Sequence, residues 1–215
     1  MKIYVISGLG ADHKVLQKLR FPDTLEVIYI KWLIPKKNEI LQHYVARMSE
    51  EINSEEPFYL LGYSFGGILV QEIHKIKPAK KVVILGSIRS HKEKSLLMKT
   101  GELTKIPHFI PKQLFNDRSA SIYGYFRKLL DPKNPKVLDF FTVRDSYYLK
   151  WSIEKIADWK SEESENIIQI MADKDIVFPI KNSKPDFVIK NATHLFPATK
   201  HKEVSLILEK IFQVK

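Results

Sequence analysis

The sequence predicts an α/β protein with a doubly wound, mostly parallel sheet of six strands and a helical lid inserted after the fourth strand. Short apolar runs alternate with stretches whose apolar residues recur at helical spacing. This alternation is typical of parallel strands joined by right-handed helical crossovers. It stops over residues 88–161 and then resumes. We therefore expect a core formed by residues 1–87 and 162–215, and a helical lid formed by residues 88–161.

The strand candidates are the short apolar runs, at residues 2–6, 25–30, 57–61, 81–85, 166–171 and 186–190. Helical spacing predicts helices over residues 12–19, 38–52, 65–76 and 199–212. Asn38 is the candidate cap of the second helix. In open parallel sheets, ligands bind at the carboxyl ends of the strands. The chemistry is therefore expected in the loops that follow Ile6, Leu61, Met171 and Lys190.

The expected lid is rich in lysine, proline and aromatic residues. Several short helices fit, broken at Pro107, Pro111, Pro132 and Pro135. Its aromatic residues are Phe109, Phe115, Tyr123, Tyr125, Phe126, Phe140, Phe141, Tyr147, Tyr148, Trp151 and Trp159. Aromatic residues at this spacing usually pack in a core, but above an active site they can also line an apolar pocket. We expect such a pocket between the lid and the strand ends. Arg118, Arg127 and Arg144 are candidates to bind a carboxylate there.

Composition and charge narrow the class of protein. The chain has 215 residues, of which 44% are hydrophobic and 28% charged, as in an ordinary soluble domain. Cysteine is absent, which excludes disulfides and thiolate chemistry and agrees with a cytoplasmic location. No apolar run suits a signal peptide or a membrane span, so integral membrane association is not expected. The formal charge is +10, but the lysines are scattered and arginines are few, so we expect no nucleic-acid partner.

Residues 62–67 carry the most informative motif. They read GYSFGG and lie between an apolar strand candidate and a helix candidate. This is the G-x-S-x-G nucleophile elbow, in which a sharp turn raises the serine hydroxyl clear of the sheet. Small residues must flank the serine because the strand and helix backbones nearly touch. The motif therefore predicts Ser64 as a nucleophile, with the N–H groups of the following helix directed at the site.

Two later loops hold suitable partners for this serine. The loop after Met171 reads ADKDIVFP and contains Asp173 and Asp175, and the loop after Lys190 contains His194. A serine, then an acid, then a late histidine is the chain order of α/β-hydrolases. A third loop, after Ile6, contains the G-x-G sequence of residues 8–10.

On these three motifs the chain resembles the α/β-hydrolase superfamily over nearly its whole length. It is most similar to the small, mostly uncharacterised bacterial members, whose core lacks the first strands and begins at the strand before the G-x-G loop. The resemblance implies that Ser64 is the nucleophile and His194 the general base. Family acid loops commonly read G-x-x-D-x-x-x-P. This register makes Asp175 the acid that orients His194 and leaves Asp173 as the alternative.

The resemblance also implies an oxyanion hole formed by the backbone N–H groups of Leu9 and Phe65. The chain departs from many relatives at the loop after Ile6 and at the histidine loop. It has Ser7 where they have histidine before the first glycine, and Ala192-Thr193 where they have two glycines before the catalytic histidine. Because the oxyanion donors belong to the backbone, the first departure need not abolish activity.

The resulting expectation is a serine hydrolase that cleaves a small-molecule carboxylic ester or related acyl bond through an acyl-enzyme on Ser64. No cofactor and no metal are expected, because no ligand spacing and no dinucleotide fingerprint occur. The other histidines are expected on surfaces, although His91 and His108 could line the pocket. The alternatives are other chemistry on the same scaffold (C–C or lactone hydrolysis, acyl transfer) and a catalytically silent fold that binds a ligand or partner.

Overall fold

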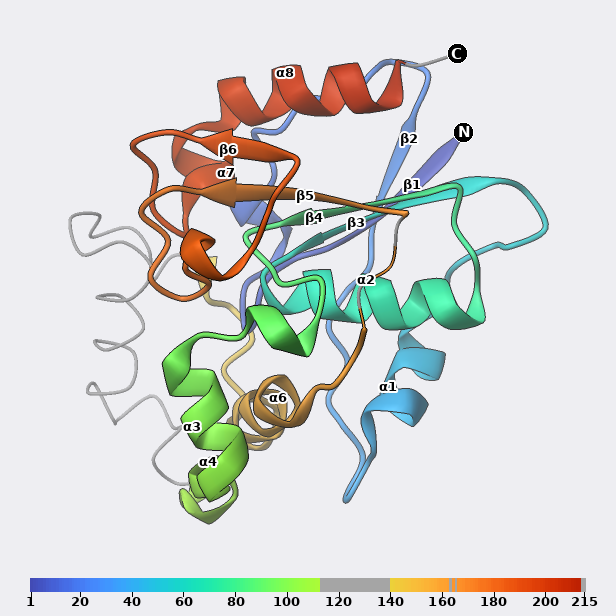
Figure 1. Cartoon of the computed structure of the whole chain (residues 1–215). Helices are drawn as coiled ribbons and strands as arrows, with labels where there is room; N and C mark the ends of the chain where they lie inside the picture. Colours follow the sequence, from blue (N-terminus) through green and yellow to red (C-terminus); the bar gives the residue numbers. More distant parts are fainter. Residues whose placement is uncertain (113–139, 163, 165, 214–215) are drawn as a thin grey trace.

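A single parallel sheet of six strands organises the chain (Figure 1). The computed structural model describes residues 1–112, 140–162, 164 and 166–213. The strands are β1 (Lys2–Ile6), β2 (Glu26–Tyr29), β3 (Phe58–Tyr63), β4 (Lys81–Leu85), β5 (Ile167–Ala172) and β6 (Phe187–Ile189). Their order in the sheet is β2-β1-β3-β4-β5-β6, and every neighbouring pair is parallel. The predicted doubly wound α/β class is confirmed.

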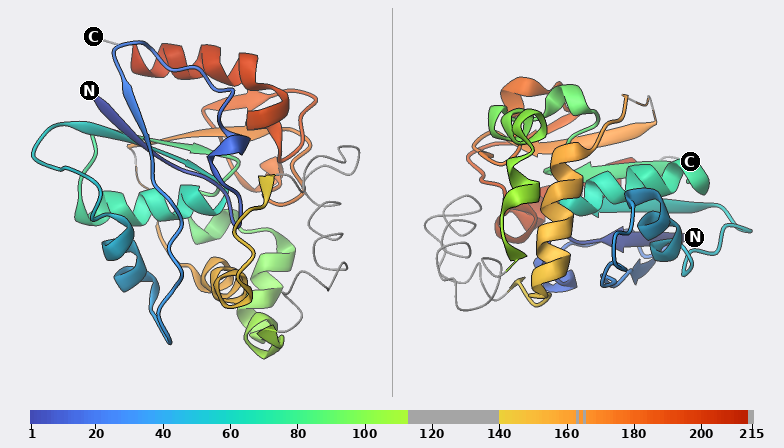
Figure 2. Two further views of the ribbon diagram at one scale, coloured as in Figure 1. Left: turned by 180° about the vertical axis from the view of Figure 1, so that it is seen from behind. Right: turned by 90° about the horizontal axis from the view of Figure 1, so that it is seen from below.

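The helices lie on both faces of the sheet and at one of its ends (Figures 1 and 2). They are α1 (Leu41–Met48), α2 (Phe65–Ile76), α3 (Leu96–Thr104), α4 (Ile106–Phe109), α6 (Ser146–Asp158), α7 (Phe196–Thr199) and α8 (His201–Phe212). Short 3-10 turns form at η1 (His13–Val15), η2 (His91–Glu93) and η5 (Ile180–Asn182).

Alternate residues of the strands build two separate cores, one on each face of the sheet. Tyr4 and Ile6 of β1 pack with α1, α2 and two tryptophans, whereas Ile3 and Val5 pack with η1 and α8. Because side chains alternate along a strand, a strand buried on both faces must be apolar throughout. Strand β3 and residues 82–85 of β4 meet this condition, and β3 carries the chain into the turn at Ser64.

The expected helix over residues 12–19 is wrong, since only the 3-10 turn η1 forms there. The side chain of Asp12 accepts the N–H of Lys14, and the backbone N–H of Asp12 donates to Phe140 O. Asp12 is therefore hydrogen-bonded to a distant part of the chain, and no longer helix continues from η1. The expected cap at Asn38 is also wrong. Asn38 has a φ of 56° and donates its N–H to Tyr147, and α1 begins only at Leu41.

The segment between β4 and β5 contributes α3, α4 and α6 (Figure 1). Helix α6 packs against α2, and Trp159, just after α6, donates from Nε1 to Glu72 of α2 at 2.8 Å. The division into a core and a lid stays a prediction. Several expected lid residues lie outside the described residues: Phe115, Arg118, Tyr123, Tyr125, Phe126, Arg127, Pro132 and Pro135. Within the described ranges, no helix is long and apolar enough to cross a membrane.

Candidate active site

Ser64 stands at the sharp turn between β3 and α2. Its backbone angles, φ 54° and ψ −120°, are unusual for a residue with a side chain. Such angles cost free energy and persist only where the surroundings enforce them, so they often mark functional sites. The turn is held because Ser64 N–H donates to Leu85 O of the neighbouring strand and Ser64 O accepts from Gly67 N–H, both at 2.9 Å.

Two glycines make this turn sterically feasible. A Cβ at Gly62 would collide with the carbonyl of Gly66, and a Cβ at Gly66 would collide with the carbonyls of Ile6 and Ser7. Both obstacles are backbone atoms, which cannot rotate away. The sequence requirement for glycine on each side of the serine therefore follows from the close approach of β3, α2 and the end of β1.

The structure brings Ser64, His194 and Asp175 together in one hydrogen-bonded chain. Nε2 of His194 lies 3.0 Å from Oγ of Ser64, and its Nδ1 lies 2.7 Å from Oδ2 of Asp175. His194 and Asp175 are buried, whereas Ser64 is partly exposed. If Nδ1 carries the proton and donates it to the carboxylate, Nε2 is free to accept the Ser64 proton. The three loops meet because they follow β3, β5 and β6 at the same edge of the sheet.

The two candidate acids have different roles in the loop after β5. The second oxygen of Asp175 accepts the N–H groups of Val177 and Phe178, at 2.8 and 3.0 Å, which fixes the carboxylate toward His194. Asp173 instead accepts the N–H of Ala192 at 3.1 Å. The hydrogen bonds from Asn191 and Ala192 lower the pKa of Asp173. Asp173 therefore joins the acid loop to the histidine loop, and its carboxylate is not hydrogen-bonded to His194.

His194 is also held by residues that the sequence analysis did not single out. The hydroxyl of Tyr63 donates to the backbone oxygen of His194 at 3.0 Å, and the ring of Phe178 lies 5.7 Å from the imidazole. Burial raises the pKa of Tyr63 well above its ordinary value, and the charge of Asp175 acts in the same direction. Tyr63 therefore remains a neutral donor. It occupies the variable position before the serine, where the motif itself carries no signal.

Of the two expected oxyanion donors, Phe65 follows Ser64 directly, and Leu9 follows Gly8, where a Cβ would lie 3.3 Å from the Ser64 Cβ. Neither Leu9 nor Phe65 donates its backbone N–H to an acceptor within the described part of the chain. Phe65 is the first residue of α2, where N–H groups lack intrahelical acceptors and the helix dipole favours negative charge. This arrangement can stabilise an oxyanion on a group attached to Ser64.

Ser7 organises the loop after β1 through its hydroxyl. Its hydroxyl donates to Ala11 O and accepts a hydrogen bond from Nε1 of Trp32 at 3.1 Å. Trp32 also donates to Ala11 O at 2.9 Å, and its ring stacks on Phe65 at 5.6 Å between centroids. One tryptophan thus contacts both the loop after β1, which carries Leu9, and Phe65 at the start of α2.

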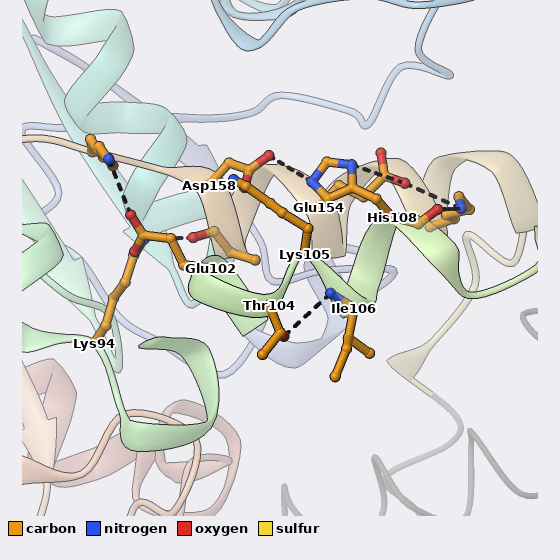
Figure 3. Close-up of polar contacts among 11 residues, drawn as sticks. Lys94, Glu102, Thr104, Lys105, Ile106, His108, Glu154 and Asp158 are labelled. Atoms are coloured by element: carbon orange, nitrogen blue, oxygen red, sulfur yellow. Dashed lines mark hydrogen bonds and ion pairs between the residues drawn. The ribbon is translucent and has the colours of Figure 1, made fainter. Parts of the chain in front are cut away.

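The two histidines considered for the pocket have other contacts. Nε2 of His108 lies 2.8 Å from Asp158 of α6 and its Nδ1 lies 3.8 Å from Glu154, within a network of ion pairs that joins α4 to α6 (Figure 3). His91 lies 2.9 Å from Ser161 O. Arg144 donates from Nε to Phe141 O. Among the described residues, no three His, Asp or Glu side chains form a group suited to a metal.

No family model and no curated protein sequence matches the chain. Solved structures of similar fold do exist. A hydrolase from Oleispira antarctica superposes with a TM-score of 0.72 at 11% identity, covering 100% of this chain and 91% of its own. An esterase from Thermogutta terrifontis superposes with a TM-score of 0.71 at 12% identity, covering 99% of this chain and 89% of its own. A lipase-esterase related protein from Clostridium acetobutylicum superposes with a TM-score of 0.65 at 16% identity, covering 98% of this chain and 93% of its own. At these identities the likeness concerns the fold.

Proposed function

The protein has the α/β-hydrolase fold, and on that premise we propose that it is a serine hydrolase acting on a carboxylic ester or related acyl bond of a small molecule. The observation that carries the proposal is the hydrogen-bonded chain from Ser64 through His194 to Asp175, with buried histidine and acid and a partly exposed serine. The esterases and hydrolases among the structures of similar fold support the same reaction class.

The proposed reaction has two halves. Ser64 Oγ attacks the acyl carbon while His194 Nε2 takes the hydroxyl proton, and the carbonyl oxygen becomes an oxyanion facing the N–H groups of Leu9 and Phe65. The C–O bond to the leaving group breaks, and His194 returns its proton to the alcohol. Water, deprotonated by His194, then attacks the acyl-enzyme and releases the carboxylic acid with Ser64 restored. Asp175 orients the imidazole and stabilises its protonated form in both halves.

The experiment that tests this function needs no known substrate. Wild-type protein and Ser64→Ala are treated with a fluorophosphonate, and the intact masses are measured. An activated serine displaces fluoride, so we expect one covalent adduct on the wild type and none on the variant. Thermal unfolding should be almost unchanged by the substitution, which removes only a partly exposed hydroxyl.

Other outcomes would redirect the proposal. An adduct that persists on Ser64→Ala would exclude Ser64 as the nucleophile. A folded wild type without any adduct would contradict the hydrolase proposal and favour a binding function on this fold. If the adduct forms but a panel of simple esters is not cleaved, C–C or lactone hydrolysis and acyl transfer become the reactions to test.

A further inference from the structure

The loop that carries Leu9 is fastened to the chain segment that leads into α6. Gly10 donates its N–H to the hydroxyl of Tyr148 at 3.2 Å, and its carbonyl accepts the N–H groups of Thr142 and Val143, each at 3.0 Å. An isolated antiparallel bridge pairs Ala11 with Phe141. In Figure 2 this segment, drawn in yellow before α6, passes beside the blue turn that follows β1. The loop after β1 is thus held by residues more than a hundred positions away in the chain.

These contacts fix the direction of the Leu9 N–H. That N–H belongs to the peptide group between Gly8 and Leu9, whose carbonyl accepts the N–H of Ala11 at 3.0 Å. The next peptide group, between Leu9 and Gly10, is held by Tyr148. Because a peptide group is planar and rigid, anchoring the groups on both sides of the Leu9 Cα leaves its N–H little freedom.

Gly10 is closely surrounded. Its φ is 66°, and a Cβ there would lie 3.2 Å from Val143 O and 3.3 Å from side-chain atoms of Leu149 and Phe141. A single hydroxyl, that of Tyr148, accepts its N–H within a buried environment. When such an acceptor is lost, the N–H must either remain unsatisfied or turn the peptide toward another partner.

We propose that Tyr148 is a positioning residue for the oxyanion hole: by accepting the Gly10 N–H, it holds the Leu9 N–H at the place where negative charge develops. This inference rests on the proposed serine hydrolase function. It also couples the inserted helices to the site, because Tyr148 belongs to α6 and its ring packs against Trp32, 5.5 Å away. Trp32 in turn stacks on Phe65, which carries the other expected donor.

The neighbouring residue supplies a matched control. Tyr147 lies on the same helix, and its hydroxyl also accepts a backbone N–H, that of Asn38 at 3.0 Å, while donating to Lys36 O. Tyr147→Phe and Tyr148→Phe therefore remove the same atom from adjacent positions of α6. Only the second change affects the loop that carries Leu9.

The test compares the two variants in p-nitrophenyl acetate hydrolysis, in phosphonylation by a fluorophosphonate and in hydrogen exchange. An oxyanion donor contributes to the transition state rather than to substrate binding. For Tyr148→Phe we expect kcat to fall about tenfold with KM changed less than about twofold, and the phosphonylation rate to fall in parallel. Backbone amides of residues 7–12 should exchange faster. Tyr147→Phe should match the wild type in all three measurements.

Equal rates in the two folded variants would overturn the inference, as would a fall in kcat matched in Tyr147→Phe. Should Tyr148→Phe not fold, 3-fluorotyrosine at position 148 keeps the hydroxyl but makes it a weaker acceptor, and unchanged rates there would also refute the role. The contact of Tyr148 with the loop and the hydrolase function can fail separately. If Tyr148→Phe speeds exchange at residues 7–12 but the wild type is never phosphonylated, the contact with the loop stands and the hydrolase function fails.

Discussion

Asp175 and Asp173 lie two residues apart after β5, and their surroundings differ at the level of single atoms. Asp175 uses one oxygen to accept two backbone N–H groups and the other to contact His194. Asp173 accepts backbone N–H groups of the neighbouring loop. An asparagine at 175 presents an amide that cannot stabilise a protonated imidazole, whereas an asparagine at 173 still offers an oxygen to Ala192.

We therefore expect Asp175→Asn to slow phosphonylation of Ser64 on the order of 10³-fold or more. Asp173→Asn should change that rate by no more than about twofold, the effect typical of a peripheral substitution. The phosphonylation rate constants of both variants can be measured in the same way, from intact mass over time. If Asp173→Asn proved the more damaging, the acid would have to be reassigned.

The residues of the candidate triad were predictable because each lies in a loop at the carboxyl end of a strand. Ser64 carries a motif, and the register of its loop favours Asp175 over Asp173. The residues that support them carry no such signal. Tyr63, Trp32 and Tyr148 act through hydrogen bonds with backbone groups of other loops. Any large aromatic residue satisfies the same apolar pattern. Their roles therefore appear only in three dimensions.

At the scale of elements, the strands were predicted more accurately than the helix ends. All six expected strands form, because a buried parallel strand needs a continuous apolar run that few other structures share. The apolar spacing of residues 12–19 is also met by a 3-10 turn packed on the sheet, so periodicity cannot separate the two. The expected last helix, over residues 199–212, forms as α8, and the short helix α7 precedes it.

An ion pair between the buried Glu39 and the partly exposed Arg47 stands at the start of α1, where a cap was expected. Both oxygens of Glu39 accept from Arg47 of α1, at 2.8 and 2.7 Å, and Glu39 also accepts the N–H of Lys36. The backbone oxygen of Glu39 accepts Nε1 of Trp151, which ties the same turn to α6. The hydrogen bonds from Arg47 hold the pKa of Glu39 below its ordinary value, although burial opposes the shift.

This pair should make stability depend on pH in a defined direction. A carboxyl whose pKa is lowered in the folded state adds stability that is fully present above its unfolded pKa, about 4.3, and is lost as the pH falls through the lower folded value. Glu39→Gln should therefore cost about 1–3 kcal/mol at pH 7. It should also flatten the fall in thermal midpoint below about pH 4.5.

Thermal unfolding between pH 3 and pH 7 tests this, with the exposed carboxylate Glu55 as control in Glu55→Gln. The control should follow the wild-type curve. A Glu39→Gln curve that stays parallel to the wild type throughout the acid range would show that the pair contributes nothing to acid sensitivity.

At the scale of the whole molecule, the sheet topology explains why distant residues form one site. The strand order places β3 in the centre, with β1 on one side and β4 and β5 on the other. All six strands run in the same direction, so the loops after β1, β3, β5 and β6 emerge at one edge. The contacts of residues 140–148 are the exception. They reach this edge from the segment between β4 and β5. The alternation of strand and helix patterns in the sequence does not predict where such a segment packs.

The charge of the whole chain leads to the last prediction. With 35 Lys and Arg against 25 Asp and Glu, the formal charge is +10 at pH 7. An excess of one sign destabilises the compact state by self-repulsion, whereas exposed ion pairs such as Lys92 with Glu162 contribute little each. Salt screens both effects over about 8 Å at 0.15 M. The long-range repulsion should dominate, so the thermal midpoint should rise between 0.01 M and 0.15 M sodium chloride at pH 7.

Sodium sulfate at matched ionic strength separates screening from specific anion binding. If screening is the cause, the two salts should raise the midpoint by similar amounts, because the Debye length depends on ionic strength alone. A midpoint that falls with sodium chloride would mean that local ion pairs outweigh the net charge. A much larger rise in sulfate at low millimolar concentration would instead indicate that some of the scattered lysines form a specific anion-binding site, since a ligand that binds only the folded state stabilises it by RT ln(1 + [L]/Kd).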